Sequence, residues 1–166
     1  LNKSPLWILD RVVITVAIAG CFIRLGNLAN SEIYGDVSNS AWEMVFTNPV
    51  RERIMMTTDG YISEVNFIEK DEYQIEDELT YPLYDLELPF SDKIANREQA
   101  ATLVRKSIKP LLDQSSKEDL NMKITGVEIV WDESERMQGT IEARGYPRSP
   151  TQIYEAIGYL VIFLIL

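Results

Sequence analysis

Hydrophobic and polar positions divide the chain into two apolar ends and a polar middle. Residues 12–23 form an apolar run without a charged residue. Residues 157–166, the last ten of the sequence, form a second apolar run. A membrane-spanning helix needs about 20 mostly apolar residues, and the first run reaches this length if Leu6 to Leu9 are included and Asp10-Arg11 is tolerated. We therefore expect an α-helical membrane protein fragment with two transmembrane helices, the second one truncated, around a soluble domain.

The polar middle predicts an inserted α+β domain of the order ββαββ. Residues 52–68 are expected to form two strands around Thr58-Asp59-Gly60-Tyr61, because Asp-Gly suits a two-residue hairpin turn. The acid-rich stretch 69–87 is expected to be a solvated loop, since it lacks the alternating carboxylates and central glycine of a calcium-binding loop. A second pair of strands is expected at residues 122–131 and 137–144, joined across residues 132–136.

A helix is predicted between the two pairs of strands. Asn96 and Gln99 have the spacing of an N-cap residue and its capping-box partner. Apolar residues then recur at helical spacing as far as Ile108, and Pro110 is expected to kink or end the helix.

Changes of composition at Asn48-Pro49 and at Pro147 set the expected domain limits. Residues 1–47 are predicted to hold a transmembrane helix and a polar loop, residues 48–145 the acidic α+β domain, and residues 146–166 the start of the next transmembrane helix. That helix is expected to begin at Pro150, because Ser149 and Gln152 occupy the positions of an N-cap residue and a capping-box partner.

The charge of the chain is concentrated in its middle. Residues 43–146 contain 12 Lys and Arg but 22 Asp and Glu, so this segment carries the whole net charge of −10. Such an acidic segment argues against nucleic acid and against tight docking to anionic lipid. Lys3 and Arg11 flank the first helix, and the positive-inside tendency places that end in the cytoplasm and residues 43–146 outside it. The single Cys21 is expected to be a small packing residue.

Polar residues gather where the first apolar run ends. Arg24, Asn27 and Ser31 are spaced to share one face if the helix continues through them. A cation and amides at the mouth of an apolar helix are costly unless they line a cavity or bind a polar group. The alternative is an arginine that snorkels to the membrane interface before an ordinary loop, and spacing alone leaves both open.

Three blocks of the sequence resemble the prolipoprotein diacylglyceryl transferase family, in the same order along the chain. Arg24-Leu25-Gly26-Asn27, followed by Asn30, Glu32 and Gly35, resembles the family signature. Trp42-Glu-Met-Val-Phe46 resembles the W-A-M-V-F stretch that follows it. The block from Tyr146 to Ala156 resembles the R-H-P-S-Q-L-Y-E element that precedes the next membrane helix.

The resemblance implies transfer of a diacylglyceryl group from phosphatidylglycerol to the lipobox cysteine of a prelipoprotein, at the bacterial inner membrane. The nucleophile belongs to the substrate, and neither a cofactor nor a metal is expected. The enzyme must hold the lipid phosphate, and arginine suits this task because its planar guanidinium can bind phosphate oxygens in a bidentate way. The candidates are Arg24 and Glu32 for catalysis, and Asn27, Asn30, Gly35, Arg148, Gln152 and Tyr154 for substrate binding.

The sequence departs from the family pattern in two places. Ser149 stands where the family has His, Ser31 stands where it has Gly, and the chain contains no His at all. The family's other histidine and second arginine belong to segments outside these residues, so the isolated chain is expected to be inactive. Two alternatives stay open: a non-catalytic, membrane-anchored binding module built on the acidic domain, and a degenerate family member that keeps the fold without the activity.

Overall fold

The computed structural model of the chain describes residues 4–114, 121–126, 129–132 and 137–166. Two compact units are present. Residues Leu1–Asp36 and Ser149–Leu166 form one of them, which we call the helical unit, and residues Val37–Arg148 form the other, the α+β unit.

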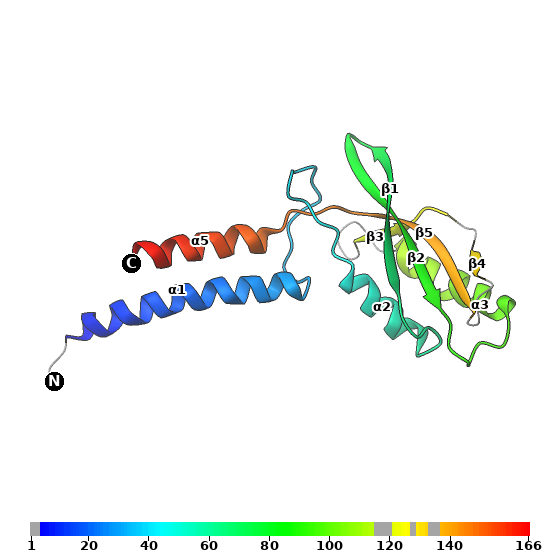
Figure 1. Cartoon of the computed structure of the whole chain (residues 1–166), viewed down its shortest axis with the longest axis horizontal. Coiled ribbons are helices and arrows are strands. Elements are labelled where there is room, and N and C mark those ends of the chain that lie inside the picture. The colour runs from blue at the N-terminus through cyan, green and yellow to red at the C-terminus, as the bar shows by residue number, and fades with distance from the viewer. Residues whose placement is uncertain (1–3, 115–120, 127–128, 133–136) are drawn as a thin grey trace. The chain divides into compact units, whose positions relative to one another are not determined.

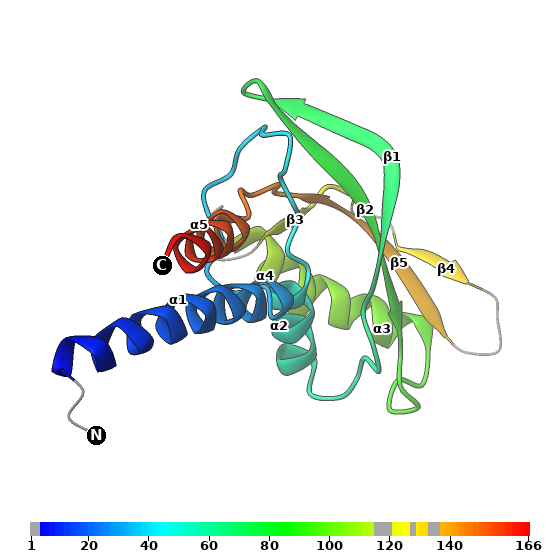
Figure 2. The same cartoon turned by 60° about the vertical axis from the view of Figure 1, so that its left-hand side comes forward.

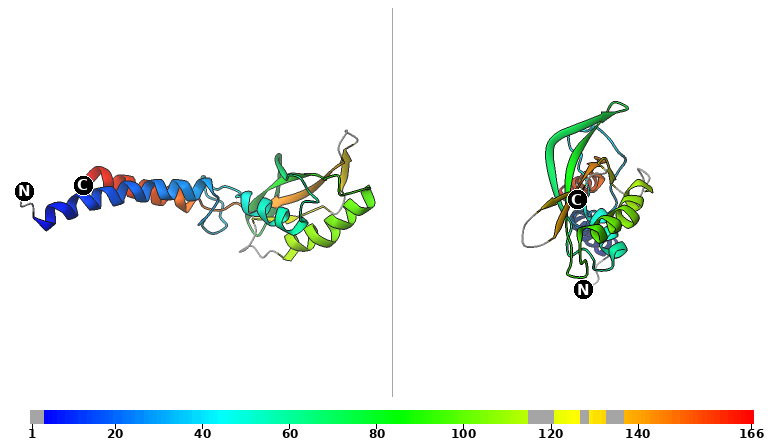
Figure 3. Two further views of the ribbon diagram at one scale, coloured as in Figure 1. Left: turned by 90° about the horizontal axis from the view of Figure 1, so that it is seen from below. Right: turned by 90° about the vertical axis from the view of Figure 1, so that its right-hand side faces the viewer.

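The helical unit consists of α1 (Pro5–Ala29) and α5 (Thr151–Ile165), which pack antiparallel against each other (Figure 1; Figure 3). Ser4 caps α1 by accepting a hydrogen bond of 3.1 Å from the N–H of Leu6. Close packing between the helices depends on Gly20, because a Cβ atom there would lie 2.9 Å from the ring of Tyr159. Cys21 is buried in this unit, as a packing residue should be.

Of the helices described, α1 is the one that is long and apolar enough to cross a membrane, with a mean hydropathy of 2.1. Helix α5 is also apolar but has only 15 residues. The expectation of a membrane-length first helix is therefore confirmed by length and composition, whereas the second transmembrane helix is not confirmed.

The α+β unit contains an antiparallel sheet with a helical layer on one face (Figure 1; Figure 2). Its strand order is β1-β2-β5-β3, and β4 also pairs with β5. The strands are β1 (Asn66–Glu76), β2 (Leu79–Pro89), β3 (Met122–Ile124), β4 (Val130–Asp132) and β5 (Gln138–Gly145). Strand β1 lies at one edge of the sheet, and its hairpin with β2 continues beyond the helical layer (Figure 2).

The helical layer is built from α2 (Asn48–Thr58), α3 (Arg97–Leu103), the π-helix η1 (Val104–Ile108) and α4 (Lys109–Gln114). Its apolar faces and the inner face of the sheet form the core of the α+β unit. The fully buried side chains of this core include Val50 and Ile54 from α2, Ile108 from η1, Leu112 from α4, and Leu86 and Leu88 from β2.

The hairpin predicted for residues 52–68 is wrong, because residues 52–58 belong to α2 and β1 begins only at Asn66. Asn48-Pro49 begins the helix, with proline in the first turn, where a missing N–H costs nothing. The Asp-Gly pair ends the helix instead of turning a hairpin, since Asp59 adopts a left-handed φ of 44° at the C-cap and Gly60 follows at 73°.

The loop predicted for residues 69–87 is also wrong, because these residues form most of the β1–β2 hairpin. Asp77 and Glu78 make its turn, with φ of 52° and 64°. Strand β1 is exposed on both faces along most of its length and therefore carries no hydrophobic alternation, whereas Tyr84, Leu86 and Leu88 alternate clearly along β2. The order of elements is thus αββαβββ and not ββαββ.

The predicted central helix and the last strands are largely confirmed. Asn96 accepts a hydrogen bond from the N–H of Gln99, and the Gln99 side chain accepts one from the N–H of Ala95, each at 3.0 Å. Pro110 does not end the helix, which continues through α4 to Gln114 after the wider turns of η1. The predicted strands correspond to β3, β4 and β5, and residues 133–136 of the predicted connection lie outside the described residues.

Candidate functional site

The polar signature lies at the carboxyl end of α1, where the helix turns into a tight loop. The helix ends at Ala29, and the N–H of Asn30 at the C-cap donates to the carbonyl of Gly26. The N–H of Glu32 then donates to the carbonyl of Asn27 at 2.8 Å. Ser31 and Ile33 both adopt left-handed backbone conformations, with φ of 59° and 57°. The signature therefore forms a folded turn and not an extended linker.

Arg24 forms an ion pair with a residue of the facing helix. Its Nε lies 2.5 Å from Oε2 of Glu155 on α5, and both side chains stay partly accessible, at 26% and 44% exposure. An arginine that merely snorkelled would extend its charge into water and would need no carboxylate partner. The pair fixes the guanidinium at the end of two packed apolar helices.

Hydrogen bonds hold residues 30–35, which we call the signature loop, against the start of α5. The N–H of Gly35 donates to the Ser149 carbonyl at 2.9 Å, and Oγ1 of Thr151 donates to the Ile33 carbonyl at 3.0 Å. Gln152, which is fully buried, donates through Nε2 to the carbonyl of Glu32 at 2.5 Å. The loop and the first turn of α5 therefore form one hydrogen-bonded structure.

Gly35 is required at this contact for reasons of space. A Cβ atom at this position would lie 2.8 Å from Cγ2 of Thr151 and 3.0 Å from the Ser149 carbonyl oxygen. Since real Cβ atoms essentially never approach other atoms this closely, any larger residue would push the loop away from α5.

The predicted start of the last helix needs a correction. Helix α5 begins at Thr151, one residue later than expected, and its N-cap Pro150 makes no side-chain capping hydrogen bond. The predicted capping box fails because Gln152 is directed to the Glu32 carbonyl of the signature loop. Gln152 therefore bonds to a carbonyl that is distant in the sequence and not to the backbone at the start of its own helix.

The structure brings most of the candidate residues together within the helical unit. Arg24, Asn27, Glu32, Gly35 and Gln152 all belong to the end of α1, the signature loop or the first turn of α5. Asn30 and Tyr154 lie on the surface of the same unit. The carboxylate that pairs with Arg24 is that of Glu155.

Arg148 belongs to the α+β unit and is 6% exposed there. Its Nε donates to Oδ1 of Asn121 at 2.5 Å, and its backbone exchanges hydrogen bonds with Met44. Asn121 is fully buried and also donates through Nδ2 to the Phe46 carbonyl at 3.0 Å. Arg148 is thus part of a buried polar network that joins the first and last segments of this unit.

Sequence reasoning missed two residues that organise these sites. Glu155 could have been found from the sequence, because it is the acidic residue of the Tyr-Glu pair in the family-like block from Tyr146 to Ala156. Asn121 carried no comparable signal, because a single asparagine before a short strand is compatible with any turn.

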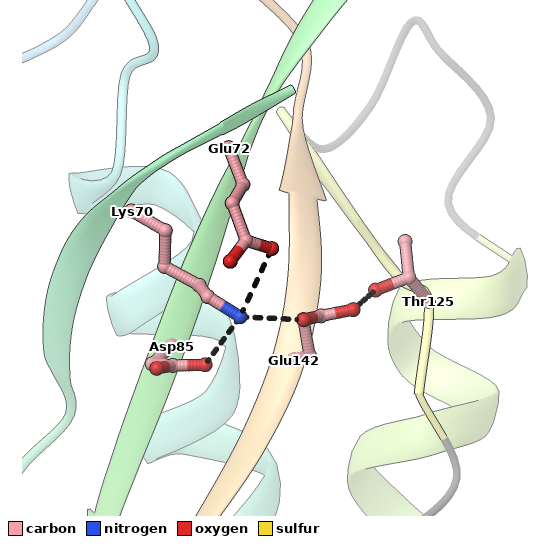
Figure 4. Close-up of polar contacts among 5 residues, drawn as sticks. All are labelled: Lys70, Glu72, Asp85, Thr125 and Glu142. Carbon is pink, nitrogen blue, oxygen red and sulfur yellow. Dashed lines mark hydrogen bonds and ion pairs between the residues drawn. The ribbon is translucent and has the colours of Figure 1, made fainter. Parts of the chain in front are cut away.

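A second polar cluster lies on the outer face of the sheet (Figure 4). Lys70 of β1 donates to Oε2 of Glu142 on β5 at 2.8 Å and lies within 4.0 Å of Asp85 on β2. Thr125 donates to the other carboxylate oxygen of Glu142 at 2.8 Å. The hydrogen bond from Lys70 is the main cause that holds the pKa of Glu142 below its usual value, and the bond from Thr125 acts in the same direction.

We expect this cluster to make the stability of the α+β unit depend on pH. Because the folded-state pKa of Glu142 is lowered, its contribution is present above the unfolded pKa of about 4.3 and is lost as the pH falls through the folded value. Glu142→Gln should therefore lower the melting temperature at neutral pH and match the wild type in strong acid. Glu64→Gln, at an exposed carboxylate, is the control. An equal effect of Glu142→Gln at both pH values would contradict this account.

In this unit an apolar helix long enough to cross a membrane ends close to an ion-paired arginine. Comparison with known families identifies the class of protein. The sequence profile described as prolipoprotein diacylglyceryl transferase matches residues 2–166. The chain belongs to the prolipoprotein diacylglyceryl transferase family, which confirms the resemblance found in the three sequence blocks.

Curated relatives match over short stretches. The chain is 54% identical over 41 residues to a phosphatidylglycerol–prolipoprotein diacylglyceryl transferase of Tolumonas auensis, which covers 25% of this chain and 16% of that protein. It is 48% identical over 45 residues to the enzyme of the same name from Porphyromonas gingivalis, covering 27% and 16%. The corresponding protein of Bacteroides fragilis is 46% identical over 39 residues, covering 24% of this chain and 14% of that protein. No solved structure matches the chain significantly.

Proposed function

We propose that this chain carries the signature site of a phosphatidylglycerol–prolipoprotein diacylglyceryl transferase of the bacterial inner membrane. The ion pair between Arg24 and Glu155 is the observation that carries the proposal, because it holds a guanidinium at the end of a membrane-length helix. Family membership supports the reaction class, and the names of the relatives indicate phosphatidylglycerol and the prolipoprotein as substrates.

In this reaction the lipobox cysteine loses its thiol proton to a base, and its sulfur attacks the diacylglyceryl carbon that bears the phosphate. A carbon–sulfur bond forms, the carbon–oxygen bond to the phosphate breaks, and glycerol 1-phosphate leaves with the electron pair. The charge that builds on the leaving phosphate is where a fixed cation contributes most to the rate. Arg24 provides this cation, and Glu155 holds its Nε edge so that the other N–H groups of the guanidinium can bind the phosphate.

The remaining candidates surround this arginine. The side-chain amides of Asn27 and Asn30 are assigned to phosphate or glycerol oxygens, and Glu32 to a glycerol hydroxyl or the thiol proton. Gln152 and Gly35 fix the signature loop against α5. Gln152 donates a hydrogen bond to the loop, and Gly35 lets the loop approach the helix closely.

Two further candidates are assigned to binding. Tyr154 is 46% exposed on α5, one residue before Glu155, and is assigned to the lipid substrate. Arg148 supports binding indirectly, because its guanidinium is engaged with Asn121 inside the α+β unit.

We further propose that residues 43–146 lie outside the cytoplasm and that residues 1–166 alone are inactive. Lys3 and Arg11 at the start of α1 support the first statement through the positive-inside tendency. The matched stretches span only 14–16% of the length of these relatives, which supports the second.

The test is a transfer assay with the full-length protein in vesicles. With phosphatidylglycerol and a prelipoprotein peptide that contains a lipobox cysteine, we expect a diacylglyceryl thioether and free glycerol 1-phosphate in equal amounts. Vesicles in which phosphatidylethanolamine replaces phosphatidylglycerol are the control and should give no product. A folded full-length protein that produces neither product would leave the binding-module or degenerate interpretation in place.

A further inference from the structure

The α+β unit contains a cleft between the overhanging β1–β2 hairpin and the segment that follows the signature loop. Its volume is about 420 Å³. Described residues of both segments line it, together with Pro147, and none of them is basic: Glu43, Met44, Val45, Glu69, Tyr73, Thr80, Pro82 and Tyr84. The cleft therefore combines an aromatic and apolar wall with two carboxylates.

The two carboxylates differ in what they already bind. Glu69 is hydrogen-bonded to the hydroxyl of Tyr84, a ring that is 7% exposed. Glu43 has a carboxylate oxygen, Oε2, that is buried and accepts no hydrogen bond from the described residues. Burial raises the pKa of Glu43, and a backbone hydrogen bond from Ser40 only partly opposes this. A buried acceptor without a donor is costly, and a cation beside this carboxylate would offset part of that cost through its charge.

The rim of the cleft is apolar and accessible. Tyr73 is 59% exposed and Met44 is 46% exposed, and both line the cleft. Trp42 and Ile75, which are close in sequence to Glu43 and Tyr73, are also exposed, at 61% and 75%. Exposed aromatic and apolar side chains gathered around a cavity are typical of a binding surface. Several exposed side chains of this kind favour a peptide, which can contact more than one of them, over a single small amine.

The charge of the surrounding unit favours a cationic ligand. Residues 37–148 contain 13 Lys and Arg against 22 Asp and Glu, a net charge of −9. An anionic ligand would be repelled both by this field and by the two carboxylates of the cleft.

We propose that this cleft binds a lysine or arginine side chain of a peptide partner. The cationic head lies in the cleft beside the carboxylate of Glu43, whose charge it balances. The aliphatic stem lies along Met44 and the ring of Tyr73, where an aromatic face also attracts the cation. The peptide residues on either side contact the apolar rim. This binding is independent of the transfer reaction, because no residue of the cleft belongs to the signature site.

The test uses the full chain in a zwitterionic detergent and a short fluorescein-labelled peptide with a central Leu-Lys-Leu. Fluorescence anisotropy should show that this peptide binds at least about tenfold more tightly than a matched peptide with norleucine in place of lysine. A peptide with glutamate in place of lysine should not bind measurably.

Three variants separate the cleft from general attraction to an acidic surface. Glu43→Gln should weaken binding of the lysine peptide about tenfold and leave the norleucine peptide unchanged. Glu64→Gln removes the same charge from an exposed position outside the cleft and should have no effect. Tyr73→Ala, a change at an exposed side chain, should weaken both peptides.

Equal binding of the lysine and norleucine peptides would overturn the proposal. So would equal effects of Glu43→Gln and Glu64→Gln, since the attraction would then come from net charge alone. Because the readout is binding and not transfer, either result would leave the proposed enzyme activity untouched.

Discussion

Replacing Arg24 by alanine is expected to lower the rate of diacylglyceryl transfer by the full-length protein at least about 100-fold, the scale of losing one transition-state donor. The reason is that Arg24 would be the group that meets the charge on the departing phosphate. Arg24→Lys should restore little activity, because a compact ammonium cannot reproduce the bidentate fork or keep the same geometry with Glu155.

Glu155→Gln tests the same arrangement from the other side. It removes the charge that holds the guanidinium but leaves Arg24 in place, so we expect a smaller loss than for Arg24→Ala. Arg53→Ala provides the control, since Arg53 is exposed on α2 in the α+β unit and is not among the candidate site residues. All four variants are compared by lipidation of a test prelipoprotein at equal expression. Near wild-type lipidation by Arg24→Ala would support the snorkelling interpretation instead.

The second large effect is expected on stability, from replacing Asn121 by alanine. This change should destabilise the α+β unit by about 2–4 kcal/mol, because it removes two side-chain hydrogen bonds, one of them to a charged group, from inside a buried network. Asn121 is fully buried, accepts from Arg148 and donates to the Phe46 carbonyl, and its own carbonyl accepts from the N–H of Tyr146 at 2.7 Å.

Denaturant unfolding of the full chain, followed by the fluorescence of Trp42 and Trp131, measures this loss. Asn96→Ala is the matched control, because it removes one helix cap in the same unit and should cost only about 1 kcal/mol. The double variant of Asn121→Ala and Arg148→Ala should be little worse than either single one, since both remove the same interaction. Fully additive losses would show that Arg148 has another, separate role, such as contact with substrate.

Local signals in the sequence were reliable where the structure uses local interactions. The capping box of Asn96 and Gln99 forms as predicted, because both of its hydrogen bonds lie within one helical turn. The Asp-Gly pair at Asp59 was misassigned, because the same left-handed backbone can end a helix or turn a hairpin. Only the burial of Val50 and Ile54 on one helix face decides between the two. Strand β1 was missed because it is an exposed edge and has no buried face to mark it.

In the candidate site too, features set by local sequence could be predicted, whereas long-range contacts could not. The positions of Arg24 and the signature loop follow from the end of an apolar helix and from the family resemblance. The partner of Arg24 could not be derived from spacing, because Glu155 lies more than 100 residues further along the chain and reaches it only through the packing of α5 on α1. The capping box predicted at Gln152 failed for a related reason, since a long-range carbonyl outcompeted the local backbone.

The α+β unit is closed at its base by its own first and last residues. Val37 and Met44 both form antiparallel bridges with Arg148, and the N–H of Ser38 donates to the Pro147 carbonyl at 3.1 Å. The chain therefore enters and leaves this unit at neighbouring points, as happens where one domain is inserted into a loop of another. Because its two ends are fixed beside each other, a change in the length of this unit would leave unchanged the distance that the segments before Val37 and after Arg148 must span.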